Sequence, residues 1–217
     1  TCNKGSGVTI VAAAGSVNNL ADDQYNNDDV YTDETTYPDI ENAVIKCKDG
    51  SQVTLCGKGA ITVTACGKNG VKGGADLYEE DADGNYTGTL LSTASLTIKD
   101  VTLNVSIKHS YKDPEDASAY DGDAIKSEKE LNILSGNITV YANDDGIKCD
   151  YTLNIGESGT TGPTIKVTKA TEGIEGSVVN VYSGNVYVTA TESRPNVWPA
   201  AYFTFPAPRD FSNIAAV

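Results

Sequence analysis

The chain has 217 residues and a formal net charge of −14, with 30 acidic and 16 basic residues. This surplus of negative charge argues against nucleic acid or an anionic membrane surface as a partner, and it favours divalent cations. The sequence contains no run of eighteen apolar residues, so we expect no membrane-spanning segment.

Composition also bears on the compartment and on the cysteines. The lack of methionine, the abundance of Thr, Asn, Gly and Tyr, and the presence of five cysteines indicate an exported chain, extracellular or at a cell surface. An odd number of cysteines leaves at least one without a partner inside the chain. Because no Cys-x-x-Cys spacing occurs, buried thiols or one or two disulfides are favoured over a zinc site, and the pairing stays open. The five are Cys2, Cys47, Cys56, Cys66 and Cys149.

Residues 1–42 are predicted to form an N-terminal cap and an acidic loop. The β-prone run VTIV at residues 8–11 suits a strand that covers the first coil of a repeat. Residues 21–41 are acidic and nearly free of aliphatic side chains, which predicts a surface loop. The alternative for this loop is calcium binding by Asp28, Asp29 and Asp33.

Residues 43–190 carry a repeat that determines the expected fold. A short motif that ends in a hydrophobic and a charged residue is followed by two runs of alternating hydrophobic residues. The whole pattern recurs along this segment. The lead residues Ile125, Ile147 and Ile174 are 22 and 27 residues apart, and the surplus lies in the Gly- and Thr-rich stretch 157–163. A fixed period with insertions in one turn is typical of a solenoid. We therefore predict an all-β parallel β-helix with irregular terminal caps.

Two insertions interrupt the repeat. Residues 74–89 contain a turn signal at 81–85 and are expected to form a loop. They lack the alternate acids and the final Glu of an EF-hand loop. A second excursion, residues 109–120, contains the only histidine, His109, which we expect to be a solvated side chain and not a catalyst.

Aligning the coils on their lead hydrophobic residues predicts columns of side chains about 4.8 Å apart. The lead column is Ile45, Val71, Ile125, Ile147 and Ile174. The next column is Lys46, Lys72, Lys126, Lys148 and Glu175. The column two residues before the lead is Ala43, Asn69, Asp123, Asp145 and Glu172. The column two residues after it is Cys47, Gly73, Ser127, Cys149 and Gly176, all small, as a tight corner requires.

Three acids in successive rungs repel one another, and further acids lie close to them in the sequence. We predict that this corner binds calcium, which takes six to eight oxygen ligands in flexible geometry. The predicted ligands are Asp121, Asp123, Asp144, Asp145, Asp150, Glu172 and Glu175. The alternative is a ladder of salt bridges in which Lys126 and Lys148 neutralise the acids.

Residues 191–217 are predicted to form a C-terminal cap. They hold four of the seven prolines, all three phenylalanines and the only tryptophan, and the prolines exclude a regular central strand. Trp198, Tyr202, Phe203 and Phe205 would seal the last coil. The alternative is that Trp198 and Tyr202 stack on sugar rings.

One motif resembles a known family. Residues 143–155 read Asn-Asp-Asp-Gly-Ile-Lys-Cys-Asp followed by Leu-Asn-Ile, which is similar to the repeat of bacterial carbohydrate-binding-domain proteins related to family 9 pectate lyases. The resemblance covers about residues 43–190. It implies a right-handed parallel β-helix, binding of plant cell-wall polysaccharide, and calcium at Asp123, Asp144, Asp145 and nearby acids. Lys148 stands where the lyase motif has an Asp, so a lyase-type calcium site would be incomplete.

Together these features predict a secreted or cell-surface calcium-binding module that binds polysaccharide, pectin-like or cellulose, without catalysis. We expect docking through a flat flank that exposes Tyr and Lys, and Lys126 and Lys148 suit an anionic glycan. The alternatives are a self-associating subunit of an extracellular layer or filament, and a calcium-dependent polysaccharide lyase. The lyase is disfavoured because a lysine in a carboxylate-rich corner stays protonated and cannot act as a base.

Overall fold

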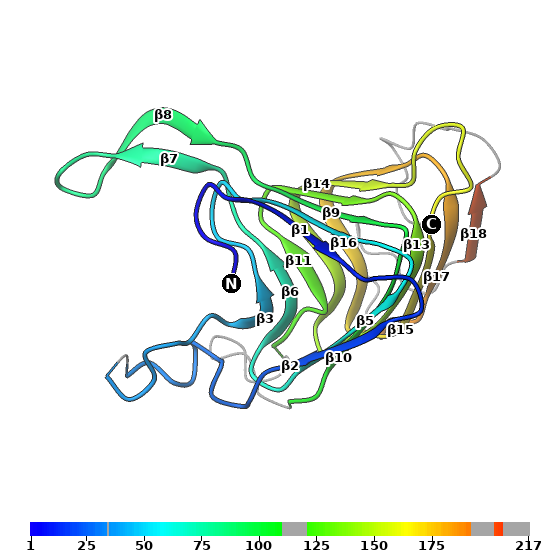
Figure 1. The fold of residues 1–217 in the computed structure, drawn as a ribbon, viewed down its shortest axis with the longest axis horizontal. Helices are drawn as coiled ribbons and strands as arrows, with labels where there is room; N and C mark the ends of the chain where they lie inside the picture. Colours follow the sequence, from blue (N-terminus) through cyan, green and yellow to red (C-terminus); the bar gives the residue numbers. More distant parts are fainter. Residues whose placement is uncertain (34, 110–120, 192–201, 206–217) are drawn as a thin grey trace.

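The computed structural model describes residues 1–33, 35–109, 121–191 and 202–205, the last four by their backbone alone. These residues form an all-β structure in which most strands run parallel, in two curled sheets and one hairpin (Figure 1). Within them we find no helix, and hence none with the length and apolar character to cross a bilayer. The all-β prediction is confirmed, and the parallel, curled sheets are consistent with a solenoid.

The larger sheet has nine strands and changes direction at β14 (Asp145–Ile155). The N-terminal part of β14 pairs with β11 (Ile125–Ser127), and its C-terminal part pairs with β12 (Glu130–Ile133). Outward from β11 follow β6 (Asn69–Gly73) and β3 (Ala43–Lys46). Outward from β12 follow β9 (Ser95–Lys99), β4 (Gln52–Cys56) and β1 (Gly7–Val11). The ninth strand, β16 (Glu172–Val181), pairs with β14 along both parts.

The second sheet has seven strands, and six of them are parallel neighbours. Their order is β17 (Gly184–Val188), β15 (Thr164–Lys169), β13 (Gly136–Tyr141), β10 (Val101–Ile107), β5 (Ala60–Ala65) and β2 (Val17–Ala21). The seventh, β18 (Tyr202–Phe205), pairs antiparallel with β17. A short antiparallel edge strand thus forms within the segment predicted to be an irregular cap, and an edge position tolerates the prolines that stand on either side of it in the sequence.

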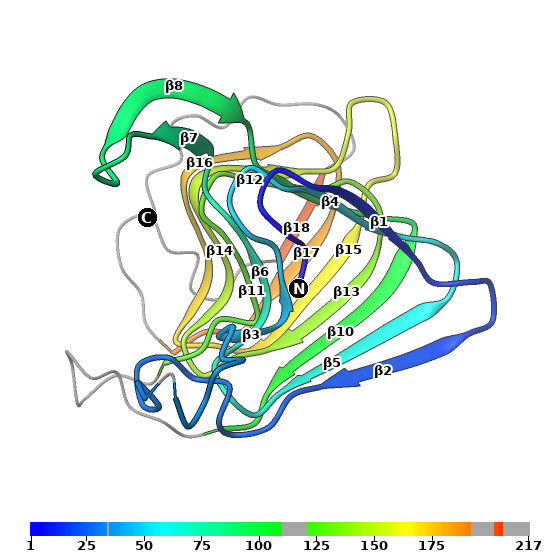
Figure 2. The same ribbon diagram turned by 60° about the vertical axis from the view of Figure 1, so that its left-hand side comes forward.

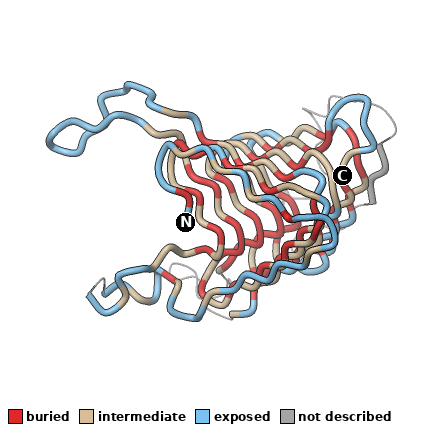
Figure 3. The backbone as a smooth tube through the Cα atoms, viewed as in Figure 1, coloured by how far each residue is buried: buried red, intermediate tan, exposed pale blue. Residues whose placement is uncertain are grey.

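The strand registers confirm the predicted columns. Ile45 pairs with Val71, Val71 with Ile125, and Ile125 with Ile147, which in turn pairs with Ile174. The column of Lys46, Lys72, Lys126, Lys148 and Glu175 follows the same pairs. Hydrophobic residues point inward at every second position, and these buried segments form a continuous core between the sheets (Figure 3).

Small residues allow the larger sheet to bend. Cys149 pairs with Ser127 and Gly176, and the register of β14 and β16 shifts just after this position. A Cβ added at Gly176 would lie 3.0 Å from Val179 Cγ2, tighter than most packed contacts. A larger side chain in this column would therefore obstruct the bend that brings the two parts of the sheet around the core.

The first insertion is more ordered than the predicted loop. Residues 77–92 form the antiparallel hairpin of β7 (Leu77–Glu80) and β8 (Tyr86–Ser92). Its turn is closed by Asp81, whose Oδ1 accepts hydrogen bonds from the backbone N–H groups of Asp83 and Asn85. The predicted turn at 81–85 is thus present, and the flanking residues pair as strands across it.

Two segments project from the same side of the molecule. Hairpin β7–β8 and the acidic segment 22–42 extend beyond the sheet edges, near opposite ends of strands β3 and β6 (Figures 1 and 2). Most residues of both segments are exposed (Figure 3). The part of the larger sheet that carries the lysine column lies between them.

Candidate metal centre

Five of the seven predicted ligands gather where three successive rungs begin. Asp123 lies just before β11, and Asp144 and Asp145 lie where β14 begins. Glu172 and Glu175 are the first and fourth residues of β16. Asp123 Oδ1 accepts a hydrogen bond of 3.2 Å from the backbone N–H of Asp145. The in-register stacking predicted from the repeat therefore brings together acids that are up to 52 residues apart, because each rung adds its own acid at the same corner.

Asp145 is common to two groups of carboxylates. Oxygens of Asp123, Asp144 and Asp145 lie within 4.8 Å of one another, and so do oxygens of Asp145, Glu172 and Glu175. Asp145 itself is 1% exposed, and Asp123 and Glu172 are also buried. The two groups thus form one acidic cluster with Asp145 at its centre.

Two lysines partly neutralise the cluster, as the salt-bridge alternative predicted. Lys148 Nζ lies 2.8 Å from Asp145 Oδ2 and 2.8 Å from Glu175 Oε2. Lys126 Nζ lies 3.5 Å from Asp123 Oδ2. With five carboxylates and two ammonium groups, three negative charges stay uncompensated if every carboxyl group is ionised.

One carboxylate oxygen has no donor. Asp145 Oδ1 is buried and accepts no hydrogen bond from any residue that the structure describes. A buried carboxylate oxygen without a donor costs several kcal/mol of free energy relative to water unless a proton or a cation compensates it. A proton or a cation bound at Asp145 Oδ1 would therefore stabilise the folded protein.

The same imbalance raises carboxyl pKa values. Burial, followed by the charges of Asp123 and Asp144, raises the pKa of Asp145 to about 9. Burial and the charge of Asp123 raise the pKa of Asp144 to about 7. In the absence of a cation, Asp145 is therefore mostly protonated at neutral pH, and Asp144 is protonated in about half of the molecules.

Lys148 and Glu175, in contrast, favour their charged forms: the pKa of Lys148 is raised and that of Glu175 is lowered. Burial lowers the pKa of Lys148, but the charge of Asp145 outweighs it, so that the pKa lies above its ordinary value. Burial raises the pKa of Glu175, but the short contact with Lys148 outweighs it and the pKa is lowered. Lys148 is consequently a fixed positive charge at physiological pH.

The donor set fits a hard cation. All candidate ligands are carboxylate oxygens, which suit Ca²⁺ and Mg²⁺ and do not suit thiolate-preferring metals. Ligands that come from three rungs at unequal depths are more compatible with the flexible geometry of Ca²⁺ than with the strict octahedron of Mg²⁺. Asp123, Asp144, Asp145, Glu172 and Glu175 are the residues that would hold the ion.

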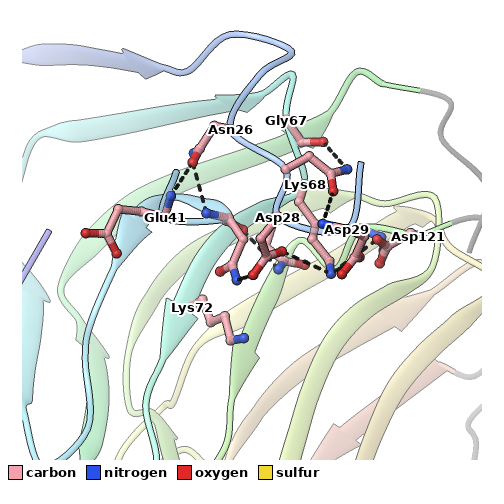
Figure 4. Close-up of polar contacts among 12 residues, drawn as sticks. Asn26, Asp28, Asp29, Glu41, Gly67, Lys68, Lys72 and Asp121 are labelled. Atoms are coloured by element: carbon pink, nitrogen blue, oxygen red, sulfur yellow. Dashed lines mark hydrogen bonds and ion pairs between the residues drawn. The ribbon is translucent and has the colours of Figure 1, made fainter. Parts of the chain in front are cut away.

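Two predicted ligands lie outside this cluster. Asp150 is exposed, and its backbone carbonyl accepts a hydrogen bond from the Ser177 hydroxyl. Asp121 lies 3.5 Å from Lys68 Nζ, beside Asp29 (Figure 4). Closeness in the sequence misled the prediction here, because the chain turns between residues 121 and 123 and again after residue 149.

Lys68 holds the acidic segment against the rungs. Its ammonium group forms an ion pair with Asp29 and lies 3.5 Å from Asp28 and from Asp121 (Figure 4). Burial and the neighbouring carboxylate of Asp29 raise the pKa of Asp121 to about 6, despite the charge of Lys68. Asp28 and Asp29, the alternative calcium ligands, are thus bound to a lysine.

Backbone contacts complete this docking. The fully buried Asn27 donates from Nδ2 to the carbonyl of Gly67, and Asn26 donates from Nδ2 to the carbonyl of Ala43. Asn26 Oδ1 also accepts from the N–H groups of Glu41 and Asn42, which closes the segment on itself (Figure 4). Asp33, the third alternative ligand, accepts hydrogen bonds from Thr35 and Thr36 within its own turn. The acidic segment is therefore a mostly exposed surface loop, as the sequence predicted, and these contacts hold it against the rungs.

The His109 side chain is partly buried. Its Nε2 lies 2.9 Å from the carbonyl oxygen of Lys68, and its own carbonyl accepts a hydrogen bond from Asn143 Nδ2. Burial lowers its pKa. The prediction of a solvated side chain was wrong, because the ring packs between the backbone of Lys68 and Gly122.

The flank of the second sheet presents a lysine and a tyrosine on neighbouring strands. Thr139, Lys166 and Tyr187 are register neighbours on β13, β15 and β17. A hollow of about 540 Å³ opens over β15 and β17. It is lined by Thr164, Lys166, Val167, Thr168, Tyr187 and Thr189.

A second aromatic feature has no counterpart among the sequence patterns. Tyr25, Tyr31 and Tyr37 pack together in the acidic segment, with ring centroids 5.0 to 5.3 Å apart. Tyr31 and Tyr37 line a pocket of ≈ 550 Å³ together with Asp28, Thr32, Pro38 and Ile40. We name these three rings the tyrosine cluster.

The predicted carbohydrate-binding residues have separate locations. Lys126 and Lys148 form the ion pairs described above, and so neutralise the acidic cluster. The backbone of Tyr202 pairs with Tyr187 at the flank of the second sheet. Trp198 lies outside the described residues.

Comparison with protein-family models, with curated proteins and with solved structures finds no match for this chain. The functional argument therefore depends on the residues and their geometry.

Proposed function

We propose that the protein is a right-handed parallel β-helix that binds calcium at the acidic cluster and binds polysaccharide outside the cell, without catalysis. The observation that carries the proposal is Asp145, a buried carboxylate with one oxygen that lacks a donor, surrounded by four further carboxylates. A divalent cation there would offset most of the uncompensated charge and link three rungs.

Calcium binding has a direct test. Chelator-treated protein is titrated with Ca²⁺ by calorimetry, and the melting temperature is recorded with and without the ion. We expect binding and a raised Tm for the wild type and for Asp150→Asn, an exposed carboxylate outside the cluster. Asp145→Asn should lose both. Wild-type protein that binds no calcium up to millimolar concentration would exclude the metal, and anomalous scattering from a crystal would locate it.

For polysaccharide, the flank of the second sheet is the favoured surface. The Tyr187 ring offers an apolar face to a sugar, the Lys166 ammonium group suits a uronate carboxylate, and the threonine hydroxyls suit sugar hydroxyls. The open, regular surface of these parallel strands suits an extended chain better than a closed pocket would.

Affinity electrophoresis in gels containing pectin or cellulose derivatives tests this surface. We expect the wild type to be retarded, and Tyr187→Ala and Lys166→Ala to be retarded less. Tyr86→Ala, which removes a tyrosine exposed on the hairpin, is the matched control and should behave as wild type. Loss of retardation in Tyr37→Ala alone would move the site to the tyrosine cluster, and no retardation on any glycan would refute sugar binding.

A structural subunit is the second candidate, and the sheet edges favour it. Strands β1 and β2 each pair with one neighbour among the described residues, and Val11 and Val17 near these edges are 63% and 69% exposed. Unpaired strand edges readily accept a strand from another chain. Filaments or layers in negative-stain images, formed with calcium and dispersed by chelator, would support this candidate.

Lyase chemistry receives less support. A base for proton abstraction has to be neutral, whereas the raised pKa of Lys148 keeps it protonated between Asp145 and Glu175. We expect no release of unsaturated product, measured by ultraviolet absorbance, from polygalacturonate with calcium.

A further inference from the structure

Two cysteines are direct neighbours at the N-terminal end of the fold. Cys2 forms a parallel β-bridge with Cys47, one residue beyond β3. The N–H of Cys2 donates to the carbonyl of Lys46 at 2.7 Å, and the N–H of Lys48 donates to the carbonyl of Cys2 at 3.0 Å. In such a register the two side chains project to the same side of adjacent rungs.

This placement suits a covalent bond. Neighbouring strands are about 4.8 Å apart, within the range of about 4.4 to 6.8 Å between Cα atoms of a disulfide. Cys2 is 7% and Cys47 is 1% exposed, and both belong to the hydrophobic core. Burial, together with the adjacent Cys2, raises the pKa of the Cys47 thiol to about 12. The two sulfurs are thus enclosed together and away from water.

No other pair among the five cysteines, all of which the structure describes, has this relation. Cys149 occupies the same column, but Gly73 and Ser127 occupy the rungs between it and Cys47. Cys56 ends β4 and Cys66 follows β5, so that a strand of six residues, about 20 Å long, separates them. A disulfide between any other two would require the rungs to rearrange.

We propose that Cys2 and Cys47 form a disulfide that joins the N-terminal segment to the first full rung. The co-reactant is a disulfide oxidant such as oxidised glutathione. One protein thiolate attacks the oxidant and releases one oxidant thiol, and the second protein thiolate then displaces the other. Two protein thiols and one oxidant disulfide become one protein disulfide and two oxidant thiols.

The bond forms while the segment is still open, because the closed structure excludes the oxidant and disfavours the thiolate. Once formed, it is shielded from reductants for the same reason. It closes the part of the chain that includes β1, β2 and the acidic segment, so it restricts the unfolded state of this whole end. This inference is independent of calcium and sugar binding.

The test uses protein refolded in a glutathione redox buffer, then denatured and alkylated without reductant. We expect three alkylated cysteines in the wild type, against five after reduction, and a linked peptide that contains Cys2 and Cys47. Cys149→Ser is the control, because Cys149 is buried and has no cysteine on the adjacent rungs, and this variant should retain the linked peptide. Five alkylated cysteines, or a linked peptide with any other pair, would refute the proposal.

A stability measurement distinguishes a disulfide that stabilises the fold from two thiols that are only in contact. We expect Cys47→Ser, Cys2→Ser and the double variant to show the same loss of Tm, on the order of 10 °C, because each removes the same cross-link. Reductant should lower the wild-type Tm when added before refolding. A wild type as stable after refolding in reductant as after refolding in oxidised glutathione would show that no stabilising bond forms.

Discussion

The two oxygens of Asp145 have different surroundings, and this difference defines the candidate metal centre. Oδ2 contacts Lys148, whereas Oδ1 faces other carboxylates without a donor. Stacking of like residues at one corner produces this situation, since every rung contributes an acid and only some rungs contribute an available lysine. A residue that would be ordinary on an exposed loop therefore has an unusual proton affinity.

The stability of the calcium-free protein should depend on pH in a specific direction. Asp145 and Asp144 have pKa values raised to about 9 and about 7, so the folded chain holds their protons more tightly than the unfolded chain does. Stability is then lost as the pH rises from the ordinary carboxyl range toward these values. In chelator, we expect Tm to fall by about 5 °C or more between pH 5 and pH 8.

Two variants separate Asp145 from other titrating groups. Asp145→Asn should flatten the dependence of Tm on pH in chelator, while Asp150→Asn should follow the wild type because Asp150 is exposed. Added calcium should restore the wild-type Tm most at the higher pH. A Tm that rises from pH 5 to pH 8 in chelator would contradict the assignment of these protons.

At the level of elements, the acidic segment 22–42 is the part whose structure depends most on a few contacts. Lys68 provides its ion pairs, and Asn26 and Asn27 provide its backbone contacts to the rungs. Local composition predicts a solvated loop because acids and polar residues predominate. The partner that orders it, Lys68, lies on a rung far along the chain, and so no local pattern reveals it.

Removing the Lys68 charge should loosen this segment. In Lys68→Met we expect residues 22–42 to exchange amide hydrogens faster and to be cut sooner by protease, because Asp28, Asp29 and Asp121 lose their shared partner. Lys58→Met, at an exposed lysine, is the control and should leave exchange unchanged. Unchanged exchange in Lys68→Met would show that the asparagine contacts alone hold the segment.

Close backbone packing at Gly67 provides a second test of the docking. A Cβ at Gly67 would lie 2.2 Å from the carbonyl oxygen of Asn26, a backbone atom that cannot move without moving the segment. We expect Gly67→Ala to lower the free energy of unfolding by about 1 to 3 kcal/mol in urea titrations. Gly7→Ala, where nothing lies within 4 Å, should change it by less than about 1 kcal/mol.

On the scale of the whole molecule, one continuous core links all rungs. Leu131 is fully buried and lies between Leu96 and Leu153 in the column of β12. Because each rung packs on its neighbours, a cavity in the middle affects the stack in both directions.

A core truncation should show this coupling. We expect Leu131→Ala to lower the free energy of unfolding by about 2 to 5 kcal/mol, measured by denaturant titration. Leu91→Ala, on the projecting hairpin and 58% exposed, is the matched control and should cost less than about 1 kcal/mol. Equal losses in the two variants would mean that the hairpin is part of the core.

Periodicity alone was sufficient for the rungs, their register and the stacking of Asp123, Asp145 and Glu172, because side chains at equivalent positions of a repeat stack in columns whatever the loops between them do. Periodicity could not predict contacts between segments that do not share the repeat. Asp121 contacts Lys68, Cys2 contacts Cys47, and three tyrosines meet in the acidic segment. These contacts arise from how the ends and insertions fold back on the stack, and only the three-dimensional path of the chain determines that.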